Sequence, residues 1–324
     1  MRVMVAEGFE GYRSLKLTER NKPTPGENEV LVRLAAAGVT PLDYTILSGH
    51  YPRAKAPLVL GNEGSGIVAS AGDPAFPEGT PVMFFGPYGV LRDGTYSEWA
   101  TIHRDHLRRV PEGVDVVAAA GLPVAYLTAQ LALEKAGFAP GKSVLAPGIG
   151  GSVGNAVTQL ARARGAAHAI STSSSTSKVR EANELGFSEV IDLSQETLRD
   201  GVRRLTDGKG VDVIIDGVGG TVLSEALGTL ALSGTAVTLG YSGGQKSTID
   251  VTDLIWKRAS LLSLALMAYA PEAWHKAWDT MEPLFTAGEL VPMVKRIFPL
   301  QEAAEALRFL TEDRPFGRVL LTAM

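Results

Sequence analysis

The sequence predicts an α/β protein of two domains, an irregular β-barrel and a parallel sheet wound with helices on both faces. Three observations predict it. The chain of 324 residues is long enough to bury two hydrophobic cores. Its N-terminal third is rich in glycine and proline and carries short β-type runs. From about Leu122 onward, segments of strand and helix character alternate.

The N-terminal runs of strand type are short and separated by turn-forming segments such as KPTPGEN and GDPAFPEGT. This spacing is typical of an irregular barrel rather than of βα units. The expected strands cover residues 29–39, 64–72, 80–85 and 95–102.

The second half begins with a helix over residues 124–137 that ends at a glycine. The strands expected after it cover residues 143–147, 167–170, 211–219 and 235–244. The helices expected between them cover residues 154–165, 177–186 and 221–234. This rhythm stops near the C-terminus, where we expect helices over 271–288 and 299–313 and a closing strand over 317–324.

Composition and charge exclude several classes of protein. The formal net charge of −4 argues against a nucleic-acid surface, and no block of like charges predicts a membrane patch. The start of the chain lacks the apolar region of a signal peptide, and the apolar stretch 261–270 is too short to span a bilayer. We therefore expect a soluble cytoplasmic protein. The absence of cysteine removes disulfides, thiolate nucleophiles and cysteine-built zinc sites.

A glycine-rich turn joins the strand at 143–147 to the following helix. Its spacing, Gly148-x-x-Gly151-x-x-Gly154, departs from a clean GxGxxG pattern because Val153 fills the sixth position. Glycines at such a turn let the backbone approach a pyrophosphate, which then lies against the amides of the helix N-terminus. The turn predicts a dinucleotide site, with a simple tight connection as the alternative.

Seven consecutive hydroxyl residues, Ser171 to Ser177, follow the next strand, with Lys178 and Arg180 just beyond. The tip of this strand is expected to meet the adenosine ribose. No acidic residue lies between Ala169 and Arg180 to accept hydrogen bonds from the ribose or repel a 2′-phosphate. The run therefore favours NADPH over NADH. A solvated loop is the alternative.

Several segments in shared order resemble the medium-chain dehydrogenase/reductase superfamily, and within it the zinc-free, zeta-crystallin-like quinone oxidoreductase branch. They are AAAGVTPLDYTILSGHYP, PLVLGNEGSGIV, LPVAYLTAQLAL, GGSVGNAVTQLARARGA, GKGVDVIIDGVGG, LGYSGG and PLQEAAEALRFLTEDRPFGRVLL. The resemblance implies a GroES-like β-barrel catalytic domain over residues 1–122 and a doubly wound, Rossmann-type NADPH-binding domain over 123–262. Residues 263–324 then return to complete the catalytic domain.

The resemblance also bears on metal binding. Zinc-containing relatives carry a cysteine where this chain has Thr40, and Gly-His-Glu where it has Gly61-Asn62-Glu63. The five histidines are scattered, and His103 and His106 have no set of carboxylates or thiols beside them in sequence. We expect no metal site.

The resemblance further implies site residues. On the catalytic side these are Thr40, Asp43 and Tyr51. Those implied to bind the cofactor are Thr128 near the nicotinamide, Gly148, Gly151, Ser152, Val153 and Gly154 at the pyrophosphate, Ser173, Ser174 and Lys178 at the 2′-phosphate, and Val218, Gly240 and Ser242 at the strand ends near the nicotinamide. Two positions depart from the branch, since Thr40 replaces a common asparagine and Leu193 replaces a tyrosine that often flanks the adenosine.

Three carboxylates also have plain structural interpretations. Asp43 could cap the helical turn that contains it, and Glu63 could be a buried partner for Arg53 or Arg92. Asp216 could hydrogen-bond the glycine turn that follows it.

The expected function is NADPH-dependent, metal-free reduction of quinones or related conjugated carbonyls. A quinone is already electrophilic, so alignment in a dry pocket supplies much of the catalysis. One alternative is an enoyl thioester or enone reductase in which Tyr51 donates a proton or a hydrogen bond. Another is a non-catalytic NADPH-binding protein, crystallin-like or redox-sensing. Relatives pair through an edge strand of the nucleotide domain, so a homodimer through residues 234–241 is expected.

Overall fold

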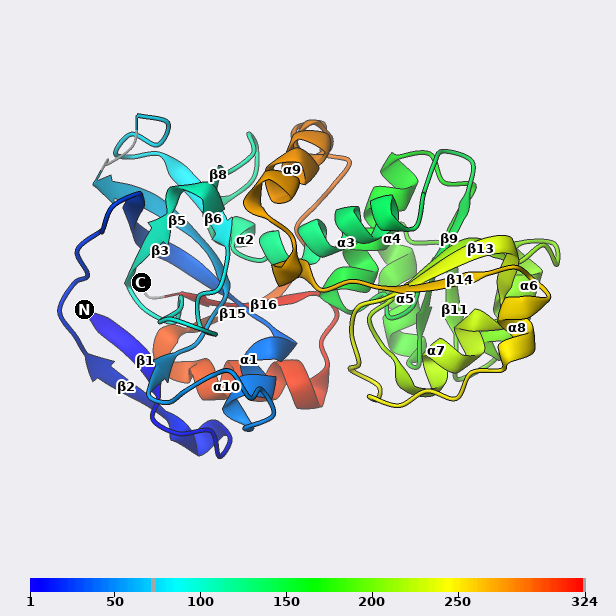
Figure 1. Cartoon of the computed structure of the whole chain (residues 1–324), viewed down its shortest axis with the longest axis horizontal. Coiled ribbons are helices and arrows are strands. Elements are labelled where there is room, and N and C mark those ends of the chain that lie inside the picture. Colours follow the sequence, from blue (N-terminus) through cyan, green and yellow to red (C-terminus); the bar gives the residue numbers. More distant parts are fainter. Residues whose placement is uncertain (71–73, 323–324) are drawn as a thin grey trace. The chain divides into compact units, whose positions relative to one another are not determined.

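The computed structural model describes residues 1–70 and 74–322. The chain divides into two compact units, the first made of Met1–Val124 and Met267–Met324 and the second of Ala125–Leu266. Figure 1 traces both units in sequence colours. The last two residues of the strand expected at 64–72, and of the one expected at 317–324, lie outside the described residues.

The first unit contains two sheets. One has the strand order β2-β1-β4, and the other has the order β15-β16-β3-β5-β6-β8, with β7 also paired to β3. The strands are β1 (Arg2–Ala6), β2 (Leu15–Glu19), β3 (Glu29–Val39), β4 (Leu58–Val59), β5 (Glu63–Ser70), β6 (Pro81–Phe85), β7 (Trp99–His103), β8 (Leu107–Arg109), β15 (Val294–Pro299) and β16 (Arg318–Thr322).

Strand β3 organises the larger sheet because it pairs antiparallel with three partners, β5, β7 and β16. Strand β16, drawn in red in Figure 1, comes from the far end of the chain and pairs Leu320 with Gly38 of β3. The C-terminal segment is therefore built into the same sheet as the N-terminal one.

Short helices connect these strands and cover the sheets. Helix α1 begins at Pro41, whose fixed φ suits the first helical position. The helices are α1 (Pro41–Leu47), α2 (Val116–Ala119), α9 (Pro271–Thr286) and α10 (Ala303–Arg308), with 3₁₀ turns η1 (Tyr12–Ser14), η2 (Arg104–His106), η3 (Leu266–Ala268) and η4 (Leu300–Glu302) and a π-helical turn η5 (Phe309–Asp313).

The core of this unit is divided between the two sheets. One cluster joins residues of β1, α1 and α10, including Val5, Leu47 and Leu307. A second cluster, which includes Val32 and Phe84, lies within the larger sheet. Each of these five side chains is buried.

The second unit is built on one sheet with the order β11-β10-β9-β12-β13-β14, in which every adjacent pair is parallel. Its strands are β9 (Ser143–Ala146), β10 (His168–Ser173), β11 (Val190–Asp192), β12 (Val211–Asp216), β13 (Leu230–Thr238) and β14 (Ser260–Ser263). Its helices are α3 (Pro123–Lys135), which begins in the first unit, α4 (Ser152–Ala163), α5 (Thr176–Glu184), α6 (Leu198–Leu205), α7 (Gly220–Leu227) and α8 (Val251–Ile255).

The two central strands, β9 and β12, are buried at nearly every position, as expected where helices cover both faces of a sheet. Helices α6 and α7 pack together, and their Val202 and Leu227 share a core cluster with Leu145 and Ile214 of the sheet. Helix α4 packs against β9 and β10.

Two sequence predictions for the second unit are wrong. The helix expected over 221–234 ends at Leu227, and Leu230 already begins β13. The segment 234–241 is not at an edge, because β13 lies between β12 and β14, and β14 ends the sheet. The four-residue β14 was too short for its pairing with β13 to be visible in the sequence.

No helix in residues 1–70 and 74–322 is long and apolar enough to cross a membrane.

Candidate functional site

The glycine turn lies between β9 and α4 and is tightly packed. Gly148 has a φ of +86°, a conformation that side-chain-bearing residues rarely adopt. A Cβ added at Gly154 would lie 2.4 Å from the carbonyl oxygen of Gly148. The turn therefore requires glycine at these two positions for its own backbone to fit.

The N-terminus of α4 has no capping side chain. Its N-cap is Gly151, which offers no side-chain hydrogen bond, so the amides of Ser152, Val153 and Gly154 begin the helix without a capping side chain. Such amides and the positive end of the helix dipole attract an anion. The residues present fit the diphosphate of a dinucleotide.

Residues from two further strand ends gather beside this turn. The side chain of Val218 lies 3.6 Å from a Cβ position built on Gly148, and the carbonyl oxygen of Val218 accepts a 2.7 Å hydrogen bond from the amide of Gly243. The Ser242 hydroxyl donates to the carbonyl oxygen of Gly217 at 3.3 Å. Gly240 faces the same Gly217 carbonyl, 2.6 Å from its Cβ position. The structure thus brings together Gly148, Val218, Gly240 and Ser242.

Asp216 supports this corner of the sheet. Its carboxylate accepts hydrogen bonds from the amides of Val218 (3.1 Å) and Gly219 (3.0 Å). Burial raises the pKa of Asp216, although these hydrogen bonds oppose the shift. The prediction that Asp216 hydrogen-bonds the following glycine turn is confirmed.

The sheet order places these residues at a topological switch point. Strand β9 is flanked by β10 on one side and β12 on the other, and the chain after β9 and after β12 carries the glycine turn and Val218. In open parallel sheets, ligands bind outside the carboxyl ends of strands at such a point.

The serine run is an ordered junction between β10 and α5. Ser171 and Thr172 lie inside the sheet, where the Ser171 hydroxyl donates to the carbonyl oxygen of Ala146 at 2.5 Å. The Thr172 hydroxyl accepts the amide of Gly148 at 3.2 Å and thus links the run to the glycine turn. Ser173 ends β10, and Ser174 is exposed at the start of the connection to α5. The run is therefore divided between the end of a strand and the start of a helix, since Ser173 ends β10 and Thr176 begins α5.

The other implied cofactor residues lie on helices or in the core. Thr128 is buried on α3, and Lys178 lies in the first turn of α5. Leu193, which replaces the tyrosine of relatives, packs against the core cluster that contains α6 and α7.

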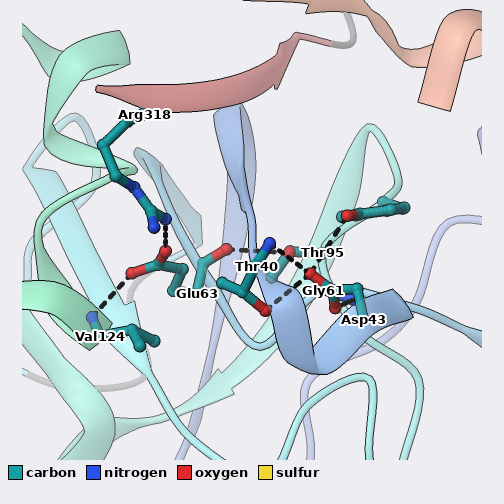
Figure 2. A network of polar contacts seen from close by, with 8 residues as sticks. Thr40, Asp43, Gly61, Glu63, Thr95, Val124 and Arg318 are labelled. Atoms are coloured by element: carbon teal, nitrogen blue, oxygen red, sulfur yellow. Dashed lines mark hydrogen bonds and ion pairs between the residues drawn. The ribbon is translucent and has the colours of Figure 1, made fainter. Parts of the chain in front are cut away.

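In the first unit, Thr40 and Asp43 form the centre of a buried polar network, shown in Figure 2. One carboxylate oxygen of Asp43 accepts hydrogen bonds from the amide (2.7 Å) and hydroxyl (2.8 Å) of Thr40 and from the hydroxyl of Tyr96 (3.2 Å). The other accepts the amide of Gly61 at 3.1 Å. The prediction that Asp43 caps its helix is confirmed.

This arrangement decides what Thr40 offers chemically. Its hydroxyl proton is committed to Asp43, so toward other groups the Thr40 oxygen is an acceptor. Burial raises the pKa of Asp43, while the hydrogen bonds from Thr40 and Gly61 oppose the shift. Burial and the neighbouring Asp43 carboxylate raise the pKa of Tyr96 well above its usual value.

Glu63 forms the second part of the network (Figure 2). One carboxylate oxygen pairs with the guanidinium of Arg318 on β16, and the other accepts the amide of Val124 at 2.7 Å. Burial lowers the pKa of Arg318 to about 10. The expected partners, Arg53 and Arg92, are therefore wrong, because the pairing of β16 with β3 brings Arg318 to Glu63.

Two further polar residues complete this region. Tyr51, in the loop after α1, is partly buried and packs against the cluster that contains Leu47. Asn62, to which the sequence assigned no site role, is 3% exposed, and its Oδ1 has no hydrogen-bond partner among the described residues. A buried polar atom without a partner usually marks a water or ligand contact.

Within the described part of the chain, no group of three His, Asp or Glu side chains could hold a metal ion. The rings of His103 and His106 lie 5.5 Å apart between centroids, and His106 bonds to the hydroxyl of Tyr88 at 2.9 Å.

A parallel sheet with a glycine turn at its switch point in one unit, and a buried polar network in the other, are typical of two-domain nucleotide-dependent oxidoreductases. Comparisons with known proteins agree. Residues 26–112 match the alcohol dehydrogenase GroES-like domain, and residues 152–283 match the zinc-binding dehydrogenase domain.

Curated relatives match over almost the whole chain. A quinone oxidoreductase of Rattus norvegicus is 30% identical over 311 residues, covering 94% of this chain and 92% of the relative. A quinone oxidoreductase of Pseudomonas aeruginosa is 31% identical over 320 residues, covering 97% of each. The solved structure of Escherichia coli quinone oxidoreductase complexed with NADPH has a TM-score of 0.88 and 27% identity, covering 99% of this chain and 100% of that one.

The chain belongs to the quinone oxidoreductase branch of the medium-chain dehydrogenase/reductase superfamily. It is an NAD(P)-dependent oxidoreductase that acts on a small molecule.

Proposed function

We propose that the protein is an NADPH-dependent reductase that transfers a hydride to quinones or related conjugated carbonyls. The observation that carries the proposal is the uncapped N-terminus of α4 behind the glycine turn, which suits a dinucleotide diphosphate. The names of the quinone oxidoreductase relatives support the choice of acceptor.

We assign the cofactor contacts on this basis. The diphosphate lies at Gly148 and residues 151–154, and the nicotinamide lies toward Thr128, Val218, Gly240 and Ser242. The 2′-phosphate lies toward Ser173, Ser174 and Lys178, at the end of β10 and the start of α5.

The reaction is NADPH + H⁺ + quinone → NADP⁺ + hydroquinone, and the bound cofactor supplies the hydride. The acceptor gains an aromatic ring, so the chain needs chiefly to align it and exclude water. An enolate from an enoyl substrate would need hydrogen-bond donors instead. Because Thr40 already donates to Asp43, that hydroxyl is poorly suited to hold an enolate, which favours the quinone.

We assign roles to the three candidate catalytic residues accordingly. Thr40 lines the site of the hydride-accepting substrate, where its hydroxyl oxygen accepts a hydrogen bond. Asp43 positions the Thr40 side chain. Tyr51 lines the pocket, and in the alternative function its phenol donates to the enoyl substrate.

The test is the initial rate of NADPH and NADH oxidation with 9,10-phenanthrenequinone and with a crotonyl thioester. We expect quinone turnover with NADPH to change less than about threefold in Tyr51→Phe, because pocket lining survives loss of the hydroxyl. Tyr44→Phe, an exposed tyrosine of α1, is the matched control.

The opposite results have clear meanings. Thioester turnover that collapses only in Tyr51→Phe would move the protein to the enoyl reductases. Binding of NADPH without its consumption by either acceptor would make it a non-catalytic nucleotide-binding protein.

We further propose a homodimer that pairs through β14, the end strand of the second sheet. Near this strand, Trp256 and Ile255 are 76% and 67% exposed, which is unusual for large apolar side chains. An end strand with apolar neighbours can extend its sheet into a second copy.

Sedimentation equilibrium tests the dimer. We expect twice the chain mass for the native protein and a shift toward the monomer for Trp256→Lys, with the exposed Leu185→Lys on the same unit as control. A monomeric native protein at micromolar concentration would contradict the proposal.

A further inference from the structure

Asp192 lies beside the serine run in space, although it is well separated from it in sequence. It ends β11, which runs parallel to β10, and its register partner is Ser173. The amide of Leu193 donates to the carbonyl oxygen of Ser173 at 2.8 Å. A carboxylate therefore lies beside the end of β10, where the sequence predicts only hydroxyl and basic side chains.

Asp192 already holds one hydroxyl of the serine run and a second hydroxyl from the segment that follows β11. Its Oδ2 accepts a 2.6 Å hydrogen bond from the hydroxyl of Thr176, the first residue of α5. Its Oδ1 accepts the hydroxyl (2.6 Å) and the amide (3.0 Å) of Ser194. These hydrogen bonds and the positive charge of Arg180 lower the pKa of Asp192, so it is ionised at neutral pH.

Other hydroxyls of the run are also engaged within the protein. The Ser173 hydroxyl exchanges hydrogen bonds with the backbone of Ser175, at 3.2 and 3.3 Å, and the hydroxyls of Ser175 and Ser177 lie 2.8 Å apart. The protein itself therefore engages these hydroxyls, while Thr176 and Ser194 donate to the Asp192 carboxylate as such groups would donate to a bound anion.

We infer that Asp192 is a specificity-determining residue of the dinucleotide site. Its carboxylate competes with the 2′-phosphate of NADPH for Thr176 and Arg180 and repels that phosphate. The preference for NADPH over NADH is consequently smaller than the serine run alone would produce. This inference rests on the proposed function, because it takes the adenosine ribose to lie at the ends of β10 and β11.

The test replaces Asp192 by asparagine, which keeps the shape and one acceptor oxygen but removes the charge. Dissociation constants for NADPH and NADH are measured by calorimetry without an acceptor, so that no turnover occurs. We expect Asp192→Asn to bind NADPH about tenfold more tightly, as one removed like-charge contact can produce, and NADH within about twofold of the native protein.

Asp200→Asn is the matched control. Asp200 also accepts a threonine hydroxyl, that of Thr197 at 2.7 Å, at the start of α6 in the same unit. The substitution changes the net charge equally, at a carboxylate whose hydrogen bond is with Thr197 and not with the serine run. We expect it to leave the NADPH to NADH affinity ratio unchanged.

Ionic strength gives a second readout. Because the effect is Coulombic, the difference between native protein and Asp192→Asn should shrink in about 0.5 M salt. If Asp192→Asn does not fold, Asp192→Ser, which keeps a hydroxyl beside Thr176, replaces it.

The outcomes separate the two claims. A native protein that binds neither nucleotide contradicts the proposed function itself. A native protein that binds both, with the same affinity ratio in Asp192→Asn or Asp192→Ser, overturns only the role of Asp192. A ratio that moves equally in Asp200→Asn, or a difference unaffected by salt, also overturns it.

Discussion

Glu63 and Arg318 form a buried ion pair whose side chains are 0% and 7% exposed. Such a pair is expensive to desolvate, and its two charges depend on each other. Glu63 also holds the amide of Val124, the last residue before the chain enters the second unit. The pair therefore joins three segments of the first unit that are distant in sequence.

We predict that Glu63→Gln lowers the free energy of unfolding by about 3–5 kcal/mol, because it leaves the Arg318 charge buried and uncompensated. Urea unfolding followed by circular dichroism measures the change.

The control is Glu98→Gln, which breaks the partly exposed pair between Arg2 and Glu98. It should cost no more than about 1 kcal/mol. Equal effects of the two substitutions would show that burial of the Glu63 pair does not govern its energetics.

Sequence reasoning about single residues succeeded where the partners are local. Asp43 capping Thr40 and Asp216 binding its glycine turn are contacts within three residues, so their spacing in the chain predicts them. Arg318 is 255 residues from Glu63, and Tyr96 is 53 from Asp43, so nothing in the local pattern selects them.

At the scale of elements, the glycine turn and the start of α4 pack closely against each other. Gly154 and Gly151 both lie beside the carbonyl of Gly148, but at different distances. A Cβ at Gly154 would meet that oxygen at 2.4 Å, whereas one at Gly151 would meet it at 3.2 Å. The φ of Gly151 is −81°, which any residue can adopt.

We predict that Gly154→Ala destabilises the protein by roughly 1–3 kcal/mol, because backbone atoms must move to admit the methyl group. Gly151→Ala, its matched control, should change the free energy of unfolding by less than about 1 kcal/mol. Thermal unfolding of the two variants is the measurement. A Gly154→Ala variant as stable as Gly151→Ala would mean that the turn relaxes freely.

Element assignments failed where helix and strand signals overlap. Residues 221–234 keep an apolar content compatible with helix, but β13 begins at Leu230 because pairing with β12 outweighs the local preference. The serine run looked like a loop by composition, yet Ser171 and Thr172 are held in the sheet by strands on both sides. The signal that could have revealed a carboxylate beside the serine run is Asp192, the acidic residue that ends the short β-type segment Val190–Asp192.

At the scale of the whole molecule, each unit has its own sheet and core, and the last segment of the chain belongs to the first unit. Helix α9 of that segment contacts η2, where His275 bonds to the carbonyl oxygen of Asp105 at 2.9 Å. Beside them, His106 packs between Tyr88 and Trp274.

The burial of His106 makes the free energy of unfolding depend on pH. Burial, reinforced by the charge of His103, lowers the pKa of His106 from 6.5 to about 4. The folded state thus favours neutral His106, and the unfolded state binds its proton first as the pH falls. The stabilisation is fully present above about pH 6.5 and is lost progressively toward pH 4.

We predict that His106→Gln flattens the fall in unfolding free energy between pH 6.5 and pH 4. Urea unfolding at several pH values measures the slope. The exposed His50→Gln should leave it unchanged. A native slope retained in His106→Gln would assign the acid sensitivity to other groups.

The sequence by itself determined the two-domain α/β class, the glycine turn before α4 and the capping of α1, because these follow from local periodicity, turn chemistry and short-range hydrogen bonds. Only the tertiary structure decided that β14 ends the second sheet, that Arg318 is the partner of Glu63 and that Asp192 stands beside the serine run. The physical reason is common to all three. Strand pairing brings together residues far apart in the chain, and the pattern of a single strand does not encode which strand will be its neighbour.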